Sequence, residues 1–293
     1  DTIRVSLSEA PEAEIPVARK LVDYITSREE HPYIPGRVHE SFNYLSPSRR
    51  ETVAVKNIGG DHLPVVIADR LDESDEIDEQ FKPDYIYCGQ TLPANRRDDI
   101  GYIVDANDWN GEDKNVYPAF NYQQMLQLHH AKADLKFLFL PYMALNREVI
   151  SALKLHPEVV IIHQTGHLHR VGEHRALAHL LMHEGITNPI VYFQHYAEDA
   201  LSDLQLRAAA DTGVLCIDGL VDGLYIHNIG NNIAPQQIDA TALNILQAAR
   251  VRTSKTEYIS CPGCGRTLYN LEETIARIKA ATSHLKGLKI AIM

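Results

Sequence analysis

The chain has 293 residues, of which 45% are hydrophobic and 23% are charged, so it is long enough to bury a large core. Its formal net charge of −11 argues against a nucleic-acid partner, because phosphate binding needs clustered Lys and Arg side chains. No apolar run approaches the roughly 20 residues of a membrane span, and four cysteines are too few for a disulfide framework, which predicts a soluble protein of a reducing compartment.

Strand patterns lie at both ends of the chain. Residues 3–7 alternate aliphatic and polar side chains, which predicts a strand with Arg4 and Ser6 on the face opposite the aliphatics, and a solvated face is the simplest role for these two. Residues 12–28 carry apolar side chains at helical spacing. Because residues 288–292 again read as a strand, neither end resembles a natural terminus, and we expect a fragment of a longer polypeptide.

The middle of the chain alternates short apolar runs with helical patterns, after a Pro-rich break at residues 31–36. Continuous apolar strands between helices imply a parallel sheet covered on its outer face. About eight such units over roughly 220 residues favour a (β/α)8 TIM-barrel-like α/β fold over an open doubly wound sheet. The expected strands are 53–55, 65–68, 85–87, 102–104, 137–140, 159–162, 190–193, 214–217 and 224–226, and the expected helices are 146–155, 173–183, 199–210 and 235–249.

Histidines crowd into residues 163–183. His167 and His169 follow an expected strand, as a metal-hydrolase pair does at the carboxyl end of a barrel strand, and His179 and His183 could share a metal on one helix face. The alternative is hydrogen-bonded side chains of a polar barrel mouth or solvent-facing helix positions, and we expect no stoichiometric zinc, manganese or iron at these residues. The other candidate ligands are His163, His174, His195, His227, Asp69 and Asp218.

The four cysteines are of two kinds. Cys88 and Cys216 lie in apolar runs and are expected to be small buried strand residues. Cys261 and Cys264 form a Cys-x-x-Cys motif on a Gly- and Pro-rich turn, ahead of a helical pattern at residues 270–281. Such a turn lets both sulfurs point into one pocket and leaves backbone N–H groups free to reach a metal sulfide. The spacing alone fits zinc knuckles, redox disulfides and iron–sulfur sites.

The segment from Ser260 to Leu268, with the helix behind it, resembles the start of the iron–sulfur domain of the 4-hydroxy-3-methylbut-2-enyl diphosphate synthase family. Residues 1–7 look like the last strand of the family's catalytic barrel, and residues 12–28 look like its last helix. The long segment between these matches is typical of the three-domain form of the family. The resemblance therefore spans the whole chain, and its specific motifs lie at the two ends.

The resemblance implies a domain organisation. Residues 1–29 would be the last strand and helix of the catalytic barrel, and residues 30–250 would be the TIM-barrel-like insert domain. Residues 251–293 would begin a small α+β iron–sulfur domain that is truncated here. The insert is expected to be a structural spacer that sets the distance between the catalytic barrel and the iron–sulfur domain.

The resemblance also implies roles for single residues. In this family, cysteine thiolates and one glutamate hold a [4Fe–4S] cluster, and Cys261 and Cys264 match the first two cluster cysteines. The third cysteine and the glutamate would follow a strand like residues 288–292, beyond this chain. Arg4 and Ser6 match residues that help to hold the substrate diphosphate. No catalytic residue is expected within the chain itself.

The implied function is that of an oxidoreductase of the methylerythritol phosphate pathway, which belongs to isoprenoid biosynthesis. The enzyme reductively opens and dehydroxylates 2-C-methyl-D-erythritol 2,4-cyclodiphosphate, and ferredoxin or flavodoxin supplies the electrons. With part of the ligand set, we expect an absent or incomplete cluster and no turnover from this chain alone. The alternatives are a metal-dependent hydrolase on a His-rich barrel and a zinc-knuckle interaction module.

The remaining expectations concern surroundings and partners. The expected compartment is the bacterial cytoplasm, or the plastid stroma if the source is a plant. The expected small-molecule partner is the diphosphate substrate, with no nucleic acid and no membrane among the partners. A homodimer is left open by the sequence.

Overall fold

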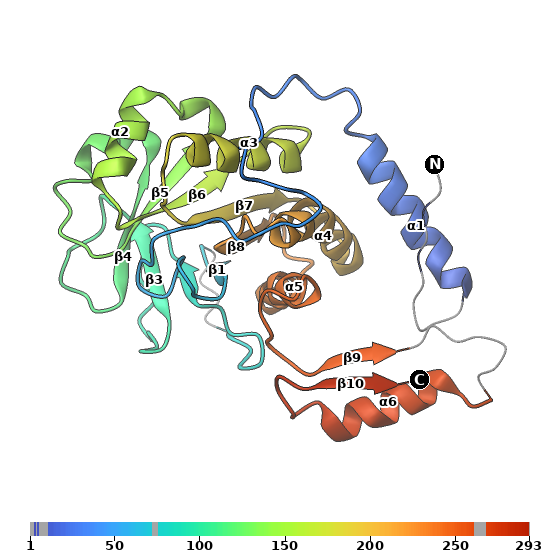
Figure 1. Cartoon of the computed structure of the whole chain (residues 1–293). Coiled ribbons are helices and arrows are strands. Elements are labelled where there is room, and N and C mark those ends of the chain that lie inside the picture. Colours follow the sequence, from blue (N-terminus) through green and yellow to red (C-terminus); the bar gives the residue numbers. More distant parts are fainter. Residues whose placement is uncertain (1–2, 4, 6–10, 72–75, 261–267, 293) are drawn as a thin grey trace. The chain divides into compact units, whose positions relative to one another are not determined.

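The computed structural model (Figure 1) describes residues 3, 5, 11–71, 76–260 and 268–292. The chain forms two compact units. Residues 31–252 form the first, here called the barrel unit, and the described residues of 1–30 and 253–293 form the second, here called the terminal unit. The assignment of the terminal unit to two parts of a longer enzyme stays a prediction. No helix among the described residues is long and apolar enough to cross a membrane.

Eight parallel strands close into a barrel, and each strand pairs with its neighbours in the sequence. The ring closes where β1 pairs with β8, with Val65 opposite Gly223 and Ile67 opposite Tyr225. The TIM-barrel-like α/β fold is therefore confirmed, and the open sheet, which would leave two unpaired edges, is excluded. The strands are β1 (Val65–Asp69), β2 (Tyr85–Tyr87), β3 (Gly101–Asp105), β4 (Val116–Asn121), β5 (Lys136–Pro141), β6 (Val159–Gln164), β7 (Ile190–Tyr196) and β8 (Gly223–Asn228).

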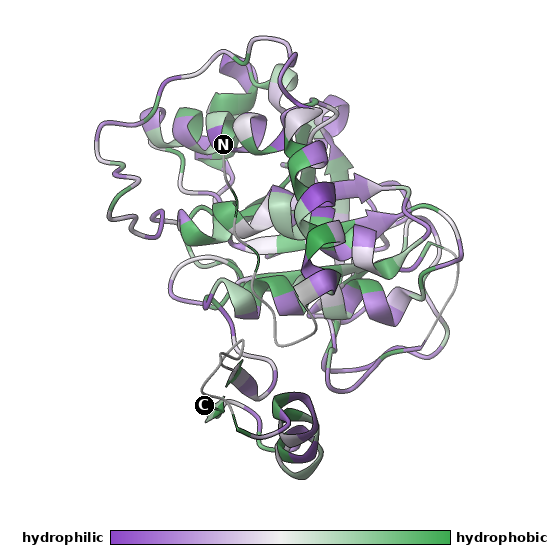
Figure 2. Ribbon diagram, turned by 90° about the vertical axis from the view of Figure 1, so that its right-hand side faces the viewer, coloured by the Kyte–Doolittle hydropathy of each residue, from purple (hydrophilic) through white to green (hydrophobic). Residues whose placement is uncertain are grey.

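Among the described residues, α-helices cover only the second half of this barrel (Figure 1). An α-helix follows each of β5 to β8, and the outer face of β1 to β3 is covered by loop side chains such as Leu92 and Trp109. Each covering helix carries hydrophobic and hydrophilic residues (Figure 2), as expected when one face packs on strands and the other meets water. The helices are η1 (Tyr122–Gln127), η2 (Tyr142–Ala144), α2 (Arg147–Leu155), α3 (Arg170–His183), α4 (Leu201–Ile217) and α5 (Pro235–Ala248).

The strand expected at residues 214–217 is wrong, because these residues form the last turn of α4. A run of four apolar residues fits a buried strand and a buried helix equally well, and only the longer window of α4 distinguishes them. Cys216 is consequently a buried helix residue and not a strand residue. Cys88 follows β2 directly and is buried, as expected.

The strand expected at residues 53–55 is also wrong, because this segment makes only an isolated bridge between Val55 and Ile58. Both side chains pack into the interior cluster of the barrel and close its amino-terminal end. The sequence analysis missed β4, whose Pro118 lacks the N–H that a strand donates to its neighbour. The barrel therefore has eight strands, but they are not all segments that were expected to be strands.

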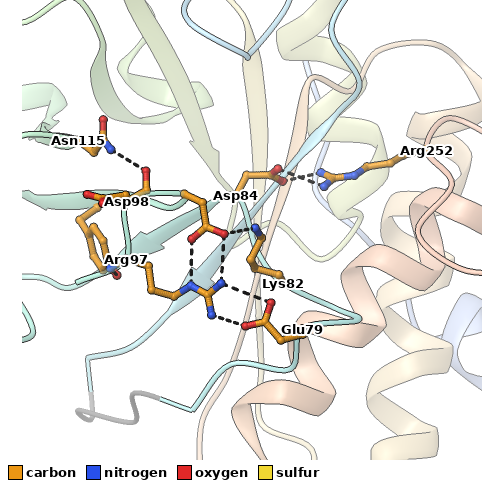
Figure 3. A network of polar contacts seen from close by, with 9 residues as sticks. Glu79, Lys82, Asp84, Arg97, Asp98, Asn115 and Arg252 are labelled. Atoms are coloured by element: carbon orange, nitrogen blue, oxygen red, sulfur yellow. Dashed lines mark hydrogen bonds and ion pairs between the residues drawn. The ribbon is translucent and has the colours of Figure 1, made fainter. Parts of the chain in front are cut away.

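Arg252, the last residue of the barrel unit, is tied to the segments that begin β1 and β2 (Figure 3). Its guanidinium donates to both carboxylate oxygens of Asp84, at 2.5 and 3.1 Å, and to the Pro64 carbonyl at 2.9 Å. Asp84 also accepts the Val66 amide at 2.8 Å. Both charged side chains are only 19% exposed, so this bidentate pair is largely withdrawn from water.

Arg252→Met should destabilise the barrel unit by about 1–3 kcal/mol, because charge-assisted hydrogen bonds are lost and Asp84 keeps a partly buried charge. Urea unfolding followed by the fluorescence of Trp109, the single tryptophan, measures the change. Arg97→Met is the matched control, since Arg97 pairs with exposed carboxylates (Figure 3) and such pairs contribute little to stability. Equal losses for the two substitutions would contradict this prediction.

The terminal unit contains a small βαβ element. Its two strands pair in parallel, from Glu257 opposite Lys289 to Ser260 opposite Ile292, and α6 is the crossover that a parallel pair requires. Asn270 caps α6 by accepting the Glu273 amide at 3.1 Å. The helix and strand expected in this part of the sequence are both present. The elements of this unit are α1 (Pro11–Thr26), β9 (Glu257–Ser260), α6 (Leu271–Thr282) and β10 (Lys289–Ile292).

Candidate functional site: the mouth of the barrel

A cavity of about 430 Å³ lies at the carboxyl ends of the barrel strands. Side chains alternate along each strand, so the interior position after Ile67 is Asp69, and the interior position after Tyr85 is Tyr87. The carboxyl face of a (β/α)8 barrel is where such folds build their active sites. The polar and aromatic residues that line the cavity are Asp69, Tyr87, Asp105, Asn107, Asn121, Gln124, Phe139, Gln164, Phe193, His195, Tyr225 and His227. We call this cavity the mouth.

Asp69 is the most heavily hydrogen-bonded acid in the mouth. Its Oδ2 accepts the Tyr225 hydroxyl at 2.5 Å and lies 3.0 Å from His227 Nδ1, and its Oδ1 accepts the Leu71 amide at 3.1 Å. Burial raises the pKa of Asp69, but the hydrogen bonds from His227, Tyr225 and Leu71 outweigh it and leave the pKa below its ordinary value. Asp69 is therefore a fixed carboxylate at neutral pH.

A second carboxylate, Asp105, faces the mouth from β3. Its Oδ1 accepts the Tyr87 hydroxyl at 2.6 Å. Burial and this hydrogen bond raise the pKa of Tyr87, so the phenol stays protonated and remains a donor to Asp105. The two carboxylates of the mouth are thus each oriented by a tyrosine from a strand of the barrel.

Amide side chains form another part of the wall. Asn121 caps η1 by accepting the amides of Gln123 and Gln124 at 3.0 and 3.2 Å, and the Gln124 side chain donates to Asn107 Oδ1 at 3.1 Å. Gln164 ends β6 and, within the described part of the chain, has no hydrogen-bond partner for its side chain. Its amide therefore offers both a donor and an acceptor to the cavity.

Two histidines stack beside Asp69. The rings of His195 and His227 lie 5.1 Å apart at an angle of 16°. Burial lowers the pKa of His195, and the neighbouring His227 and Arg170 lower it further, so His195 is neutral at pH 7. The stack adds a neutral imidazole to the mouth beside the oriented Asp69.

The mouth is built for neutral polar contacts. None of its described lining residues is a lysine or an arginine, so a phosphate would meet carboxylates without a compensating cation. No group of three or more His, Cys, Asp or Glu among the described residues is placed to hold a metal ion. The structure therefore gives the metal-hydrolase alternative no ligand set in the part of the chain that it describes.

Of the histidines considered as ligands, only His195 and His227 reach the mouth. His163 of β6 and His174 of α3 are fully buried behind the barrel wall, with their Nδ1 atoms 2.6 Å apart. His174 Nε2 lies 2.7 Å from the side-chain nitrogen of Gln194. Burial lowers the pKa of His163 to about 3 and that of His174 well below its ordinary value, so both rings are neutral.

The remaining histidines of α3 and of the loop before it hold residues 31–48, which we call the strap, against the barrel. The contacts are His167 Nε2 with the Pro32 carbonyl (3.2 Å), His183 Nε2 with the Arg37 carbonyl (3.1 Å) and the His39 amide with His179 Nδ1 (3.4 Å). His169 Nδ1 accepts the Gly172 amide and caps α3. Asp218 pairs with Arg175 at the end of α4, outside the mouth. The histidines that hold the strap and cap α3 therefore lie outside the mouth.

Four of the residues singled out in the sequence lie outside the described residues: Arg4, Ser6, Cys261 and Cys264. Their roles stay predictions. The sequence analysis missed the amide and tyrosine side of the mouth. The signal was present, since Tyr87, Asp105 and Gln164 each end an apolar run at the position that continues the inward alternation.

No family model matches the chain. Curated relatives match its whole length: one from Phocaeicola vulgatus is 69% identical and one from Bacteroides thetaiotaomicron is 64% identical over 293 residues, and both are named 4-hydroxy-3-methylbut-2-en-1-yl diphosphate synthase (flavodoxin). A chloroplastic rice relative, named as the ferredoxin form of this synthase, is 38% identical over 131 residues, which is 44% of this chain and 17% of the relative. The chain covers 48% of each of the first two and so spans about half the length of the curated relatives it matches.

Proposed function

Because this chain belongs to the 4-hydroxy-3-methylbut-2-en-1-yl diphosphate synthase family, we propose that it supplies the barrel unit and part of the iron–sulfur site of such an enzyme. The observation that carries the proposal is the 69% identity to a named synthase over the full length of the chain. The proposed reaction reductively opens 2-C-methyl-D-erythritol 2,4-cyclodiphosphate and removes a hydroxyl as water. Flavodoxin or ferredoxin, which appear in the names of relatives, is the proposed electron donor.

Cys261 and Cys264 are the proposed ligands of a [4Fe–4S] cluster. Thiolates are the ligands that iron–sulfur clusters use, and a Cys-x-x-Cys turn supplies two of them from one segment, so the donor set fits. When bound, the cluster supplies single electrons to the substrate. This chain would contribute two cysteine ligands of the cluster, and both follow β9 closely in the sequence.

The geometry of β9 and β10 supports this placement. The strands are parallel and Ile292 lies opposite Ser260, so their carboxyl ends are at the same edge. In the longer proteins of this family, the segment that follows β10 would therefore begin at the same sheet edge at which β9 ends. That is where the further cysteine and the glutamate of the cluster would be supplied.

Arg4 and Ser6 are the proposed contacts of the substrate diphosphate. A guanidinium and a hydroxyl are groups that bind phosphate oxygens, Arg by paired N–H donors and Ser by its O–H. The mouth of the barrel unit, by contrast, presents two carboxylates and no lining cation among its described residues. This contrast favours diphosphate binding near Arg4 over binding in the mouth.

The barrel unit is the proposed spacer of the enzyme. Its strap begins beside His167 at the mouth end, and its last residue, Arg252, is fixed near the amino-terminal ends of β1 and β2. The chain therefore enters and leaves the unit at opposite ends of a closed barrel. A closed barrel with both connections fixed by hydrogen bonds is suited to hold a defined separation.

Anaerobic reconstitution with iron and sulfide tests the proposed cluster. A synthase of full family length should bind about four irons and absorb near 400 nm, whereas this chain alone should not hold a stable cluster, because two thiolates are half of the required set. Iron analysis and an absorption spectrum of the two proteins decide the matter. A full-length protein that stays colourless and binds zinc would instead favour the zinc-knuckle alternative.

A further inference from the structure

We propose that the mouth of the barrel unit binds a small, uncharged polyhydroxylated molecule, a sugar or polyol without phosphate. This ligand site goes beyond the proposed function, in which the barrel unit acts as a spacer. The site stands on three properties of the mouth: its lining charge, its uncommitted hydrogen-bonding groups and its aromatic walls. Each property excludes a different class of ligand.

The charge of the lining excludes anions. Asp69 and Asp105 both face the cavity, and no lysine or arginine is among its described lining residues. Arg70, the nearest cation in sequence, is buried in an ion pair with Asp239, and it lines a neighbouring cavity. A phosphate or carboxylate ligand would therefore meet two carboxylates and no lysine or arginine among the described lining residues.

The hydrogen-bonding groups favour hydroxyls. Gln164 and the side chain of His195 have no hydrogen-bond partner among the described residues, so an amide and an imidazole are available to a ligand. A hydroxyl can both donate and accept, and this pair of groups, together with the second oxygen of Asp105, offers both a donor and acceptors. Tyr225 and Tyr87 hold the carboxylates in place before any ligand arrives, which reduces the entropic cost of binding.

Aromatic rings complete the wall. Phe139 lies edge-on to Tyr87 at 5.5 Å, and Phe193 lies edge-on to Tyr225 at 4.6 Å. Such rings present apolar surface to the C–H groups of a sugar or polyol, while the carboxylates and amides meet its hydroxyls. A volume of about 430 Å³ is within the range of small-molecule sites and accommodates a molecule of six carbons.

The absence of a metal group fits the same ligand class. Among the described residues, no set of three or more His, Cys, Asp or Glu is placed around a common point. Asp69 Oδ2 already accepts Tyr225 and contacts His227. A neutral ligand that shares these acceptors needs no such set.

Titration of this chain with defined probes tests the proposal. The neutral probes are erythritol, D-xylose, D-glucose and myo-inositol, and the charged probe is D-glucose 6-phosphate. Calorimetry and saturation-transfer NMR should show that at least one neutral probe binds with a Kd below about 1 mM, which corresponds to a binding free energy of about −4.1 kcal/mol. The phosphorylated probe should bind at least about tenfold more weakly than D-glucose, because its charge faces Asp69 and Asp105.

Three variants assign the binding to the mouth. Gln164→Ala should weaken the best neutral probe about three- to tenfold, the change expected for one neutral hydrogen bond, whereas Gln127→Ala, at an exposed glutamine outside the cavity, should change nothing. Asp105→Asn keeps the acceptor for Tyr87 and removes a negative charge. It should therefore reduce the difference in Kd between D-glucose and D-glucose 6-phosphate. Thermal unfolding checks that each variant is folded.

The contrary outcomes are equally definite. The proposal is overturned if no neutral probe binds with a Kd below about 1 mM, or if the phosphorylated probe binds as tightly as D-glucose. It is also overturned if Gln164→Ala and Gln127→Ala bind alike. None of these results bears on the iron–sulfur proposal, because the assays contain neither iron nor an electron donor.

Discussion

In a synthase of full family length, Cys261→Ser should remove the iron–sulfur cluster and lower turnover by more than about a hundredfold, which exceeds the loss expected when only a hydrogen-bond partner of a metal ligand is removed. Serine has no thiolate to offer at neutral pH, so one iron loses its protein ligand. The measurements are the iron content after anaerobic reconstitution, the absorbance near 400 nm and the rate of product formation with a one-electron donor.

Cys88→Ser in the same protein is the matched control. Cys88 is a buried thiol beside β2, 3.7 Å from the Ile86 carbonyl, and it belongs to the barrel unit. It should leave iron content and turnover unchanged. A Cys261→Ser protein that keeps about four irons and full turnover would sink the assignment. Loss of folding would appear separately, as a change in the far-UV circular dichroism of the variant.

The sequence was sufficient to predict a barrel strand wherever that strand is buried on both faces. β1, β6 and β7 each begin with a continuous apolar run of four residues, which is the pattern of a parallel sheet covered on its outer face. The sequence analysis missed β4 because Pro118 interrupts the apolar run. In the structure β3 pairs with residues 116–119, with Val104 opposite Pro118, and β5 pairs with residues 119–121. Residues 116–121 are therefore a strand because of their pairing with β3 and β5, and this pairing is not visible in the sequence of the segment alone.

The strand prediction at residues 214–217 failed for a different reason. Leucine, valine and cysteine are compatible with a buried strand, and the run follows a glycine. In the structure, Leu215 and Cys216 are buried together with Leu204 and Ala208, which lie about two to three turns earlier, as expected for one helix face. The helix pattern of residues 199–210 continued further than its apolar residues alone indicated.

The mouth was half predictable. Asp69, His195 and His227 were recognised as residues at strand ends, and the structure brings them together. Asp105 and Gln164 were not recognised, since a single polar residue after an apolar run is common in solvent-exposed loops. Their role depends on the strand register, which turns both side chains into the barrel. Register across a closed barrel is a property of all eight strands and not of a local window.

Acidification should destabilise the barrel unit through its buried histidine pair. The folded state holds the pKa of His163 at about 3, against 6.5 for the unfolded chain, because burial penalises the charged ring. The unfolded state therefore binds a proton that the folded state refuses, so stability is complete above pH 6.5 and falls as the pH approaches 3. At pH 5, His163 alone should cost about 2 kcal/mol, and the lowered pKa of His174 acts in the same direction.

The hydrogen bonds explain why the pair resists a proton. Arg170 Nη1 lies 3.4 Å from Gln194 Oε1, which turns the Gln194 amide nitrogen toward His174 Nε2 as a donor. The proton of His174 is then on Nδ1 and points to His163 Nδ1 at 2.6 Å. A second proton on either ring would place two donors against each other in a fully buried site. Desolvation and donor–donor repulsion therefore both lower the pKa of the two rings.

His163→Gln isolates this contribution, because glutamine does not titrate and its carbonyl can still accept from His174. Between about pH 7.5 and pH 5, the variant should lose roughly 2 kcal/mol less stability than the unmodified chain in urea unfolding, whatever its stability at pH 7.5. His129→Gln, at an exposed histidine that meets water in both states, should follow the unmodified chain. If all three proteins lose stability in parallel as the pH falls, the buried pair is not the origin of the acid sensitivity, and carboxylates such as Asp69, whose pKa is lowered by His227 and Tyr225, would have to carry it instead.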